Sequence, residues 1–388
     1  MSIVILDGTR TPFGKWKGAL SPFSAKDLAT HTLTNLLERT PEAKEADGVL
    51  LAQVIQAGQG QNPARQVAAR SGIDLKTPAI TLNNVCLGGL ATIADSFRRI
   101  TLGEGELYVV GGFDSMTNAP HTLPVRSENG FGHIEATDTL LHDGLWCSLT
   151  NQSMGLLTDQ VNRDHGIDRP SQDRYAAQSQ QRAAKAQQQG NLKAEITPIP
   201  DYLDEDEGIR PRTTEEKLAK LSPAFSEDGT ITAGNASQMT DGASLGIVTT
   251  SEKAQALGHT PLAEVVDWSE IAGPDESLQT KPSRAIRELL SKHELTTDDI
   301  DLFEINEAFA SVVLASCDDL GIDETRVNVN GGAIAVGHPL GGTGFRLVLT
   351  LIHELKRRGG GKGIASLCGG GGQGMALLID VPKKEEVE

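Results

Sequence analysis

The sequence carries one succession of elements twice, near its two ends. The first copy runs AITLNNVCLGGLATIADSFRRI (79–100) and then ELYVVGGFDS (106–115), which reads as strand, glycine-rich turn, helix, strand and glycine pair. The second copy, RVNVNGGAIAVGHPLGGTGFRLVLTLIHELKRR (326–358) and then GIASLCGGGG (363–372), repeats that order. Strands that alternate with helices are typical of α/β proteins. The duplication therefore predicts two similar α/β halves within one chain.

Composition divides the 388 residues into three regions. Residues 1–116 and 241–388 alternate apolar strands with helical patterns, and they are the expected N-terminal and C-terminal halves. Residues 117–240 are more polar and have few strand signals, which indicates an inserted domain. Its clearest element is a helix over SQDRYAAQSQQRAAKAQQQ, for which Ser171 is the expected N-cap and Gly190 the expected end.

Charge and targeting signals narrow the classes of function. A formal net charge of −17 argues against nucleic acid or an anionic membrane surface as a partner. No apolar run approaches the ~18 residues that a membrane span needs, and the start MSIVILDGTRTPFG lacks the pattern of a secretory signal. The four cysteines lack metal-ligand spacing, so we expect reduced thiols, no metal and a cytoplasmic location.

Cys86 stands between an Asn-Asn pair and a Gly-Gly pair, where the chain turns into a helix. Unpaired N–H groups and the helix dipole stabilise a thiolate there, which predicts a lowered pKa and a reactive nucleophile. Gly88 and Gly89 leave the backbone open to a ligand. The alternative is a buried structural cysteine, the commoner role of a free thiol. Cys147 and Cys317 have no such setting, and we expect them to be packing residues.

Three other side chains stand at strand ends or loops of the same kind. His338, on a loop dense in glycine, could take a proton from a thiol. The alternative is a phosphate-binding loop, although GGTGFR does not fit the G-x-G-x-x-G spacing. Cys368 precedes four glycines whose N–H groups could hold an oxyanion, and Asn306 is either a site residue or a helix cap. Together these residues favour a reactive role for Cys86.

Eight stretches carry a family resemblance, in order along almost the whole chain: RTPFGKWKGAL (10–20), GQGQNPARQVA (58–68), NNVCLGGL (83–90), GGFDSMTNAPH (111–121), TAGNASQMTDGAS (232–244), EINEAFA (304–310), NVNGGAIAVGHPLGGTG (328–344) and LCGGGGQG (367–374). In these motifs the chain resembles the thiolase family, and within it the acetyl-CoA C-acetyltransferase branch. The resemblance implies a thiolase-like fold. Such a fold has two similar halves of βαβαβαββ type, stacked in five layers, α-β-α-β-α, with an inserted loop domain for CoA binding and oligomerisation.

The resemblance also implies an activity. It is the reversible Claisen condensation of two acetyl-CoA to acetoacetyl-CoA and CoA through an acyl-cysteine, with coenzyme A as substrate and product and no further cofactor. The residue matching Cys86 becomes acylated, the one matching His338 takes its proton and contributes to a first oxyanion site, and Asn306 matches the asparagine that holds a water there. Cys368 matches the cysteine that removes an α-proton from the second acetyl-CoA. N–H groups matching those of Cys86 and Gly370 form a second oxyanion site.

The same resemblance places coenzyme A along the inserted region. Ser237 matches a serine that contacts the pantetheine arm, Arg210 matches a basic residue near the nucleotide end, and Met154 matches a methionine that lines the acyl pocket. Residues 118–144 match the loop through which thiolases assemble, which implies a homodimer or homotetramer.

Three positions depart from the family pattern. Gly88 and Thr343 stand where serine is usual, and Ser153 stands where the short-chain biosynthetic branch commonly has histidine. The last departure leaves a degradative 3-ketoacyl-CoA thiolase for longer chains as an alternative. From another class, the alternative is an inactive CoA-binding scaffold protein.

Overall fold

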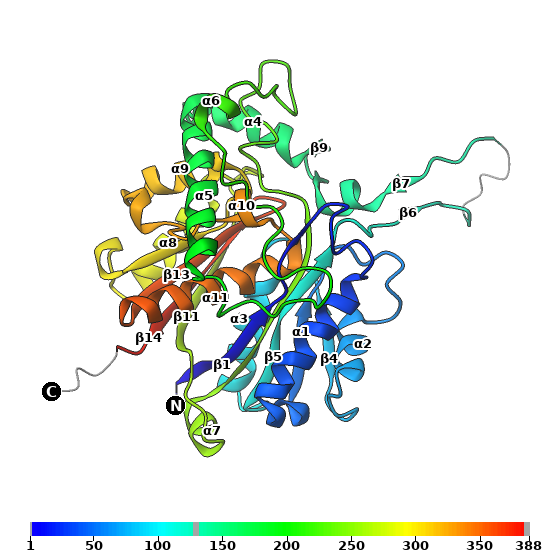
Figure 1. The fold of residues 1–388 in the computed structure, drawn as a ribbon, viewed down its shortest axis with the longest axis vertical. Coiled ribbons are helices and arrows are strands. Elements are labelled where there is room, and N and C mark those ends of the chain that lie inside the picture. The colour runs from blue at the N-terminus through cyan, green and yellow to red at the C-terminus, as the bar shows by residue number, and fades with distance from the viewer. Residues whose placement is uncertain (1, 127–131, 384–388) are drawn as a thin grey trace.

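The computed structural model describes residues 2–126 and 132–383 and has the α/β architecture expected from the duplication (Figure 1). The N-terminal sheet has the spatial order β4-β3-β5-β10-β1, and the C-terminal sheet the order β11-β14-β13-β12. The two sheets join edge to edge through β1 and β11, where residues 3–5 pair with residues 263–265. The strands are β1 (Ile3–Arg10), β3 (Gly48–Ala52), β4 (Ala79–Leu82), β5 (Leu107–Ser115), β10 (Thr240–Thr250), β11 (Ala263–Ala272), β12 (Leu302–Ile305), β13 (Gly361–Gly369) and β14 (Gln373–Val381), with the short β2 (Gly14–Lys15) attached to β10.

Helices form layers outside and between these sheets: α1 (Ala25–Arg39), α2 (Pro63–Arg70), α3 (Gly88–Thr101), α8 (Lys281–Lys292), α9 (Ala310–Leu320) and α11 (Leu340–Arg358). Helices α3 and α11 lie between the sheets, because one buried cluster joins Leu90 of α3 and Phe345 of α11 to Val110 of β5 and Leu377 of β14. Helices α1 and α2 pack on the outer face of the N-terminal sheet, and α8 and α9 on that of the C-terminal sheet. The expected order of five layers is therefore confirmed.

The second copy of the repeat differs from the first in one element. RVNVN, which reads as a strand, makes a single bridge, between Phe303 and Val327. Asn328 follows with a left-handed φ of 48°. Its side chain accepts from the N–H of Ile305 at 2.9 Å and donates to the carbonyl of Ile305 at 2.8 Å. A side chain that bonds nearby backbone in this way competes with a strand ladder, so the segment continues as a loop towards His338.

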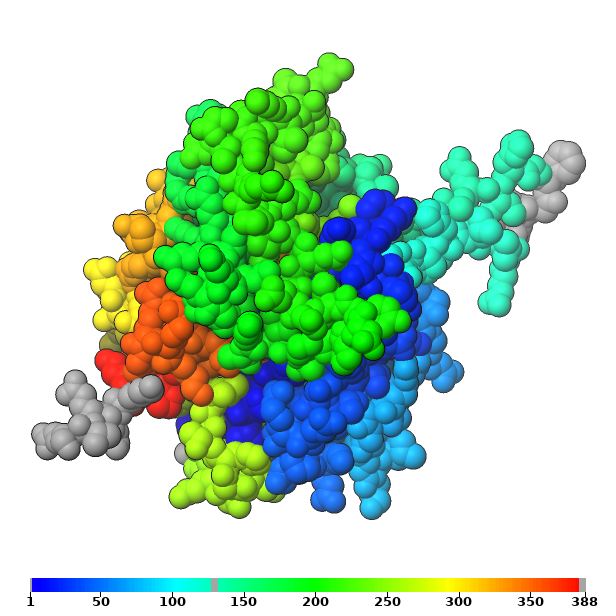
Figure 2. Space-filling view, viewed as in Figure 1, coloured from blue at the N-terminus to red at the C-terminus, as the bar shows by residue number. Residues whose placement is uncertain are grey.

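The inserted region covers the upper part of the face shown in Figure 2. The arm that carries β6 and β7 stands away from the rest of the molecule (Figures 1 and 2). The elements of the region are β6 (His121–Thr122), β7 (Thr137–Asp138), β8 (Trp146–Cys147), β9 (Gln152–Ser153), α4 (Met154–Asp164), α5 (Arg169–Gln189) and α6 (Glu215–Leu218). Strand β10, which begins at the boundary expected near residue 241, pairs with both β1 and β5. That strand therefore completes the N-terminal sheet.

Helix α5 begins earlier than its sequence suggests. Its N-cap is Asp168, whose carboxylate accepts from the N–H of Ser171 at 2.9 Å. The expectation that Ser171 is the cap is therefore wrong, because the helix begins at Arg169, which makes Asp168 the capping residue and places Pro170 in the first turn, where proline is favoured. Gly190 ends the helix with a φ of 74°, as expected. Neither α5 nor any other helix of the described residues has the length and apolar character needed to cross a membrane.

Buried ion pairs tie the inserted region to the N-terminal half. Arg10, at the end of β1, donates through two guanidinium nitrogens to Asp206, at 2.7 and 2.8 Å. Its Nε donates to Glu195 at 2.8 Å, and all three side chains are buried. Bidentate arginine–carboxylate bonds fix geometry as well as charge, so this cluster holds the inserted region in register with β1.

Candidate active site

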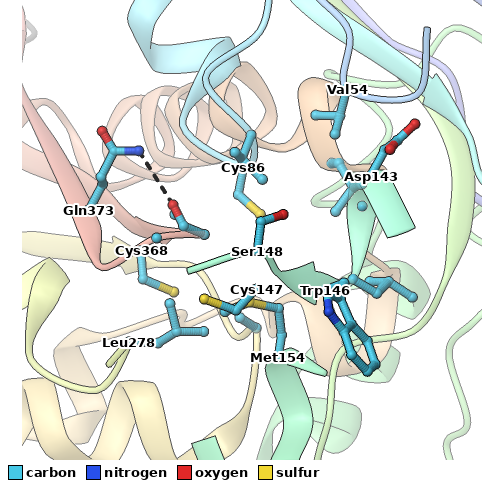
Figure 3. Close-up of a pocket in the computed structure, with 18 of the residues that line it drawn as sticks. Val54, Cys86, Asp143, Trp146, Cys147, Ser148, Met154, Leu278, Cys368 and Gln373 are labelled. Carbon is cyan, nitrogen blue, oxygen red and sulfur yellow. Dashed lines mark hydrogen bonds between the residues drawn. The ribbon is translucent and has the colours of Figure 1, made fainter. Parts of the chain in front are cut away.

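One cavity of about 1020 Å³ lies where the two sheets, the central helices and the inserted region meet. Cys86, Cys147 and Cys368 lie around it, with Met154 and Leu278 on one side (Figure 3). Six of the residues expected at the site line this cavity: Cys86, Met154, Ser237, His338, Cys368 and Gly370. The structure thus brings together residues that are up to 284 positions apart in the printed sequence, from Cys86 to Gly370.

Cys86 sits on a strained turn just before α3. Val85 has a φ of 48°, which is a real outlier for a β-branched residue. The side chain of Asn83 supports the turn by accepting from the N–H of Val85 at 3.0 Å. Strain of this kind costs roughly 1–3 kcal/mol and persists where the surrounding structure enforces it. The turn directs the Cys86 thiol into the cavity (Figure 3).

His338 stands beside the thiol, with its Nε2 3.2 Å from Cys86 Sγ. Its Nδ1 lies 2.6 Å from the hydroxyl of Thr343, which also lies 3.4 Å from the Pro339 carbonyl. When the hydroxyl donates to that carbonyl, it accepts from Nδ1–H and leaves Nε2 free to accept the thiol proton. Thr343, which replaces a more usual serine, therefore keeps the hydroxyl that orients the imidazole.

Burial controls the protonation of this pair. It raises the pKa of the Cys86 thiol to about 12, and the nearby carboxylate of Asp114 adds to the rise. The expected lowering of this pKa is not found, because loss of hydration outweighs the backbone hydrogen bond that lowers it. Burial also lowers the pKa of His338 to about 3, with a smaller contribution from Arg346. The resting pair is therefore a neutral thiol and a neutral imidazole, and the proton moves as the sulfur attacks.

Cys368 lies at the end of β13, opposite Gly374 of β14. Its side chain is buried, and burial raises the pKa of its thiol, with Cys86 as the next cause. In the turn that follows, Gln373 donates through its side chain to the carbonyl of Gly370 at 3.3 Å (Figure 3). A thiolate formed in such a dry place is a strong base, which suits removal of a weakly acidic C–H proton.

Asn306 is buried at the end of β12, and its amide is unpartnered among the residues that the structure describes. Buried amides are normally hydrogen-bonded, so this side chain fits the expected role of holding a water. It is not one of the residues that line the cavity. The neighbouring Glu307 accepts from Tyr175, Ser179 and the N–H of Ile334, which makes it a structural link.

The residues expected to hold coenzyme A divide between two places. Ser237 and Met154 line the cavity, whereas Arg210 lines a separate hollow of about 420 Å³. That hollow also contains Arg212 and Lys217, so it is positively charged. Ser153 caps α4, since its hydroxyl accepts from the N–H of Leu156 at 3.2 Å, and this contact explains a serine at this position.

The requirement for Gly88 also has a local cause. A Cβ at this position would lie 2.6 Å from the Cβ of Ala52 on β3, closer than two carbon atoms can pack. At Gly89 a Cβ would lie 2.7 Å from the backbone nitrogen of Phe345 in α11. Both glycines therefore allow the start of α3 to pack against its neighbours without intervening side chains.

Sequence reasoning missed two residues near the reaction centre. Cys147, expected to be a packing residue, is buried and also lines the cavity from β8. Nothing in the segment LWCSL indicates this position, because the hairpin of β8 and β9 is what brings Cys147 to the cavity. Asp114 follows the glycine pair of β5 and is fully buried. The sequence did contain a signal for Asp114, which is a carboxylate at the end of an expected strand. Cys317 packs in the buried cluster outside the C-terminal sheet, as expected.

Comparison with known proteins identifies the family. A family model described as thiolase, N-terminal domain, matches residues 3–252, and one described as thiolase, C-terminal domain, matches residues 259–381. A probable acetyl-CoA acetyltransferase of Mycolicibacterium smegmatis is 46% identical over 387 residues, which cover 97% of this chain and 100% of the relative. The acetyl-CoA acetyltransferase of Allochromatium vinosum is 42% identical over 391 residues, covering 98% and 99%.

Solved structures agree with this result. The Bacillus anthracis acetyl-CoA acetyltransferase superposes with a TM-score of 0.95 at 37% identity, covering 98% of this chain and 99% of the other. The human mitochondrial 3-ketoacyl-CoA thiolase in complex with CoA gives 0.94 at 37% identity, covering 98% of both chains. Family models and relatives thus extend along nearly the whole sequence, and the chain belongs to the thiolase family.

Proposed function

We propose that the protein catalyses the reversible condensation of two acetyl-CoA to acetoacetyl-CoA and CoA. The observation that carries this proposal is the 3.2 Å contact between Cys86 Sγ and His338 Nε2, in a cavity that Cys368 also lines. A nucleophile beside a base, with a second base in reach, is what a two-step acyl transfer requires. Relatives named acetyl-CoA acetyltransferase support the choice of acetyl-CoA.

In the first step Cys86 Sγ attacks the thioester carbon of acetyl-CoA. The thiol proton passes to His338 Nε2 and then to the departing CoA sulfur, so that CoA leaves as a thiol and Cys86 carries the acetyl group. The low pKa of His338 makes its protonated form a strong acid, which favours return of the proton to the leaving group. No bound cofactor is needed in this step.

In the second step Cys368 first loses its thiol proton to solvent, and the thiolate so formed removes an α-proton from another acetyl-CoA. The carbanion attacks the acetyl carbon on Cys86, the C–C bond forms, and Cys86 leaves as a thiolate. The Cys368 thiol then gives its proton to Cys86, and the Cys368 thiolate that remains takes a proton from solvent, which restores the starting protonation of both thiols. Donors held around the thioester oxygens in a dry cavity stabilise the developing negative charge; the unpartnered amide of Asn306 and the backbone near Gly370 are the candidates.

Intact-mass analysis after incubation with acetyl-CoA tests the proposal. We expect an acetyl adduct that peptide mapping places on Cys86, and none on Cys86→Ala. An unmodified parent protein, or an adduct that survives the substitution, would contradict the acyl-cysteine intermediate and would favour the inactive scaffold.

The second candidate is a degradative 3-ketoacyl-CoA thiolase for longer chains. It is favoured by Ser153, which serves as a helix cap where the short-chain branch commonly has histidine, and by the match to a 3-ketoacyl-CoA thiolase structure. Thiolysis rates for acetoacetyl-CoA and for a medium-chain 3-ketoacyl-CoA separate the two. A strong preference for the longer substrate would overturn the first choice.

We also propose that the protein works as a cytoplasmic homodimer or homotetramer. The arm around β6 and β7 exposes Leu123, Val125 and Ile134, and the edge strand β4 exposes Ile80. Exposed apolar side chains on a projecting arm, together with a strand at the edge of the sheet, are features that a second copy of the chain would cover. Light scattering coupled to size exclusion measures the mass, and a monomer at micromolar concentration would contradict this assembly.

A further inference from the structure

The carboxylate of Asp114 lies at the end of β5 and is fully buried. Three backbone N–H groups donate to it. Ile55 donates to Oδ1 at 3.0 Å, whereas Val54 and Gly341 donate to Oδ2 at 3.1 and 2.8 Å. A carboxylate that gathers backbone donors from separate segments holds those segments at a fixed distance.

Both segments belong to the reaction centre. Val54 and Ile55 follow β3, and Val54 lines the cavity. Gly341 is in the first turn of α11, three residues after His338. Packing at this junction leaves no room for side chains, because a Cβ at Gly341 would lie 2.8 Å from the carbonyl oxygen of Ala52. Asp114 is thus the polar group that joins the His338 turn to the neighbouring loop.

We propose that Asp114 is a positioning residue for acyl transfer: its carboxylate fixes the turn that carries His338 and so holds the imidazole beside Cys86. This inference rests on the proposed function. It concerns a residue that does not itself line the cavity and therefore acts through Cys86 and His338.

The electrostatics agree with this geometry. Burial raises the pKa of Asp114 to about 6, the three N–H groups oppose the rise, and the charge of Asp241 on β10 adds to it. After burial, Asp114 is the next cause of the raised pKa of Cys86. Below pH 6 a protonated Asp114 presents an O–H where three backbone N–H donors converge. The hydrogen bonds that hold the His338 turn to the loop after β3 therefore weaken. We therefore expect acylation to slow as the pH falls through about 6, in a range where His338 does not titrate.

Asp114→Asn and Asp241→Asn form a matched pair for the test. Asp241 is also a buried carboxylate, but it accepts from Ser115 at 3.0 Å and from the N–H of Thr117 at 2.9 Å, and from neither loop of the site. The rate of Cys86 acetylation is measured from pH 5 to 9 for both variants and the parent. Alkylation of Cys86 by iodoacetamide is followed over the same range, since it does not require thiolase activity.

For Asp114→Asn we expect the rate of Cys86 acetylation to fall roughly ten- to hundredfold, as for a misplaced base. The decrease of this rate as the pH falls through about 6, here called the acid limb, should disappear. Its alkylation profile should move to lower pH, with a gain of about tenfold for each unit by which the thiol pKa falls. A merely loosened cavity would instead raise alkylation equally at every pH. Asp241→Asn should keep the limb and move it to lower pH, because Asp114 then ionises more easily.

An unchanged limb and an unchanged alkylation profile in Asp114→Asn would overturn the inference. So would the same loss of the limb in Asp241→Asn. If Asp114→Asn does not fold, Asp114→Glu keeps the charge and must keep the limb; a lost limb in this folded variant counts against the inference. A parent protein that is alkylated but never acetylated would refute the proposed function, while the alkylation profiles would still decide the role of Asp114.

Discussion

At the scale of single residues, reactivity comes from a neutral thiol held next to a neutral imidazole. Motif and spacing were enough to predict Cys86, His338 and Cys368, because each lies in a glycine-rich segment that differs from an ordinary core. The protonation state of Cys86 could not be predicted in the same way. It depends on how completely the inserted region and α11 exclude water, and a sequence does not contain that information.

Iodoacetamide should label Cys86 before Cys147 and Cys317. The reason is access, because Cys86 is half-buried and the other two thiols are buried. Peptide mapping of a partially labelled sample measures the order. Equal labelling of the three at low conversion would show that the cavity is closed to small reagents.

Gly88→Ser should destabilise the fold by about 1–3 kcal/mol, the usual cost of overpacking. The new Cβ would meet the Cβ of Ala52 at 2.6 Å. Adding Ala52→Gly removes that contact, so the double variant should recover most of the loss. Chemical denaturation of both single variants and the double variant measures the coupling, and purely additive effects would contradict a direct clash.

At the scale of elements, the repeat predicted the order of strands and helices well, since apolar periodicity and glycine turns are local signals. Local signals failed where side chains replace backbone bonds. Asn328 takes over the hydrogen bonds of an expected strand, and Asp168 takes the cap expected of Ser171. At α5 both Asp168 and Ser171 are competent caps, and Pro170 in the first turn favours the earlier one.

Asp168→Ala should cost about 1 kcal/mol of unfolding free energy, because α5 loses its N-cap. Ser171→Ala is the matched control; its hydroxyl donates to the carbonyl of Asp168 at 3.0 Å and caps nothing. The control should change stability by less than about 0.5 kcal/mol. Thermal and chemical unfolding of the pair test the assignment, and a larger loss in Ser171→Ala would return the cap to that residue.

At the scale of the whole molecule, the site exists only where separate parts meet. The thiol comes from the N-terminal half, the imidazole and second thiol come from the C-terminal half, and the inserted region supplies the remaining wall. Asp114 escaped the sequence analysis for this reason, since its hydrogen-bond partners Val54, Ile55 and Gly341 are distant along the chain. Cys147 escaped it because the hairpin of β8 and β9, and not a motif, places it at the cavity. Stability of the interfaces between the parts is therefore a condition for activity.

Arg10→Met should lower the free energy of unfolding by about 3–5 kcal/mol, because Asp206 and Glu195 would remain buried without their counter-charge. Arg39→Ala is the control, as its bond to Asp7 at 2.8 Å lies at the surface and contributes about 0–1 kcal/mol. Denaturation curves of the two variants measure the contrast. Similar small losses in both would show that the inserted region is held in place by other contacts.

Cys86 and His338 occupy corresponding positions in the two copies, each two residues before the start of a central helix. Two identical subunits related by a twofold axis must present the same residue to each other at such a place. Thiol would then face thiol, or imidazole would face imidazole. A single chain that contains both copies escapes this restriction, since each position can change alone. Covalent linkage of the halves is thus what permits two different functional groups to meet across their boundary.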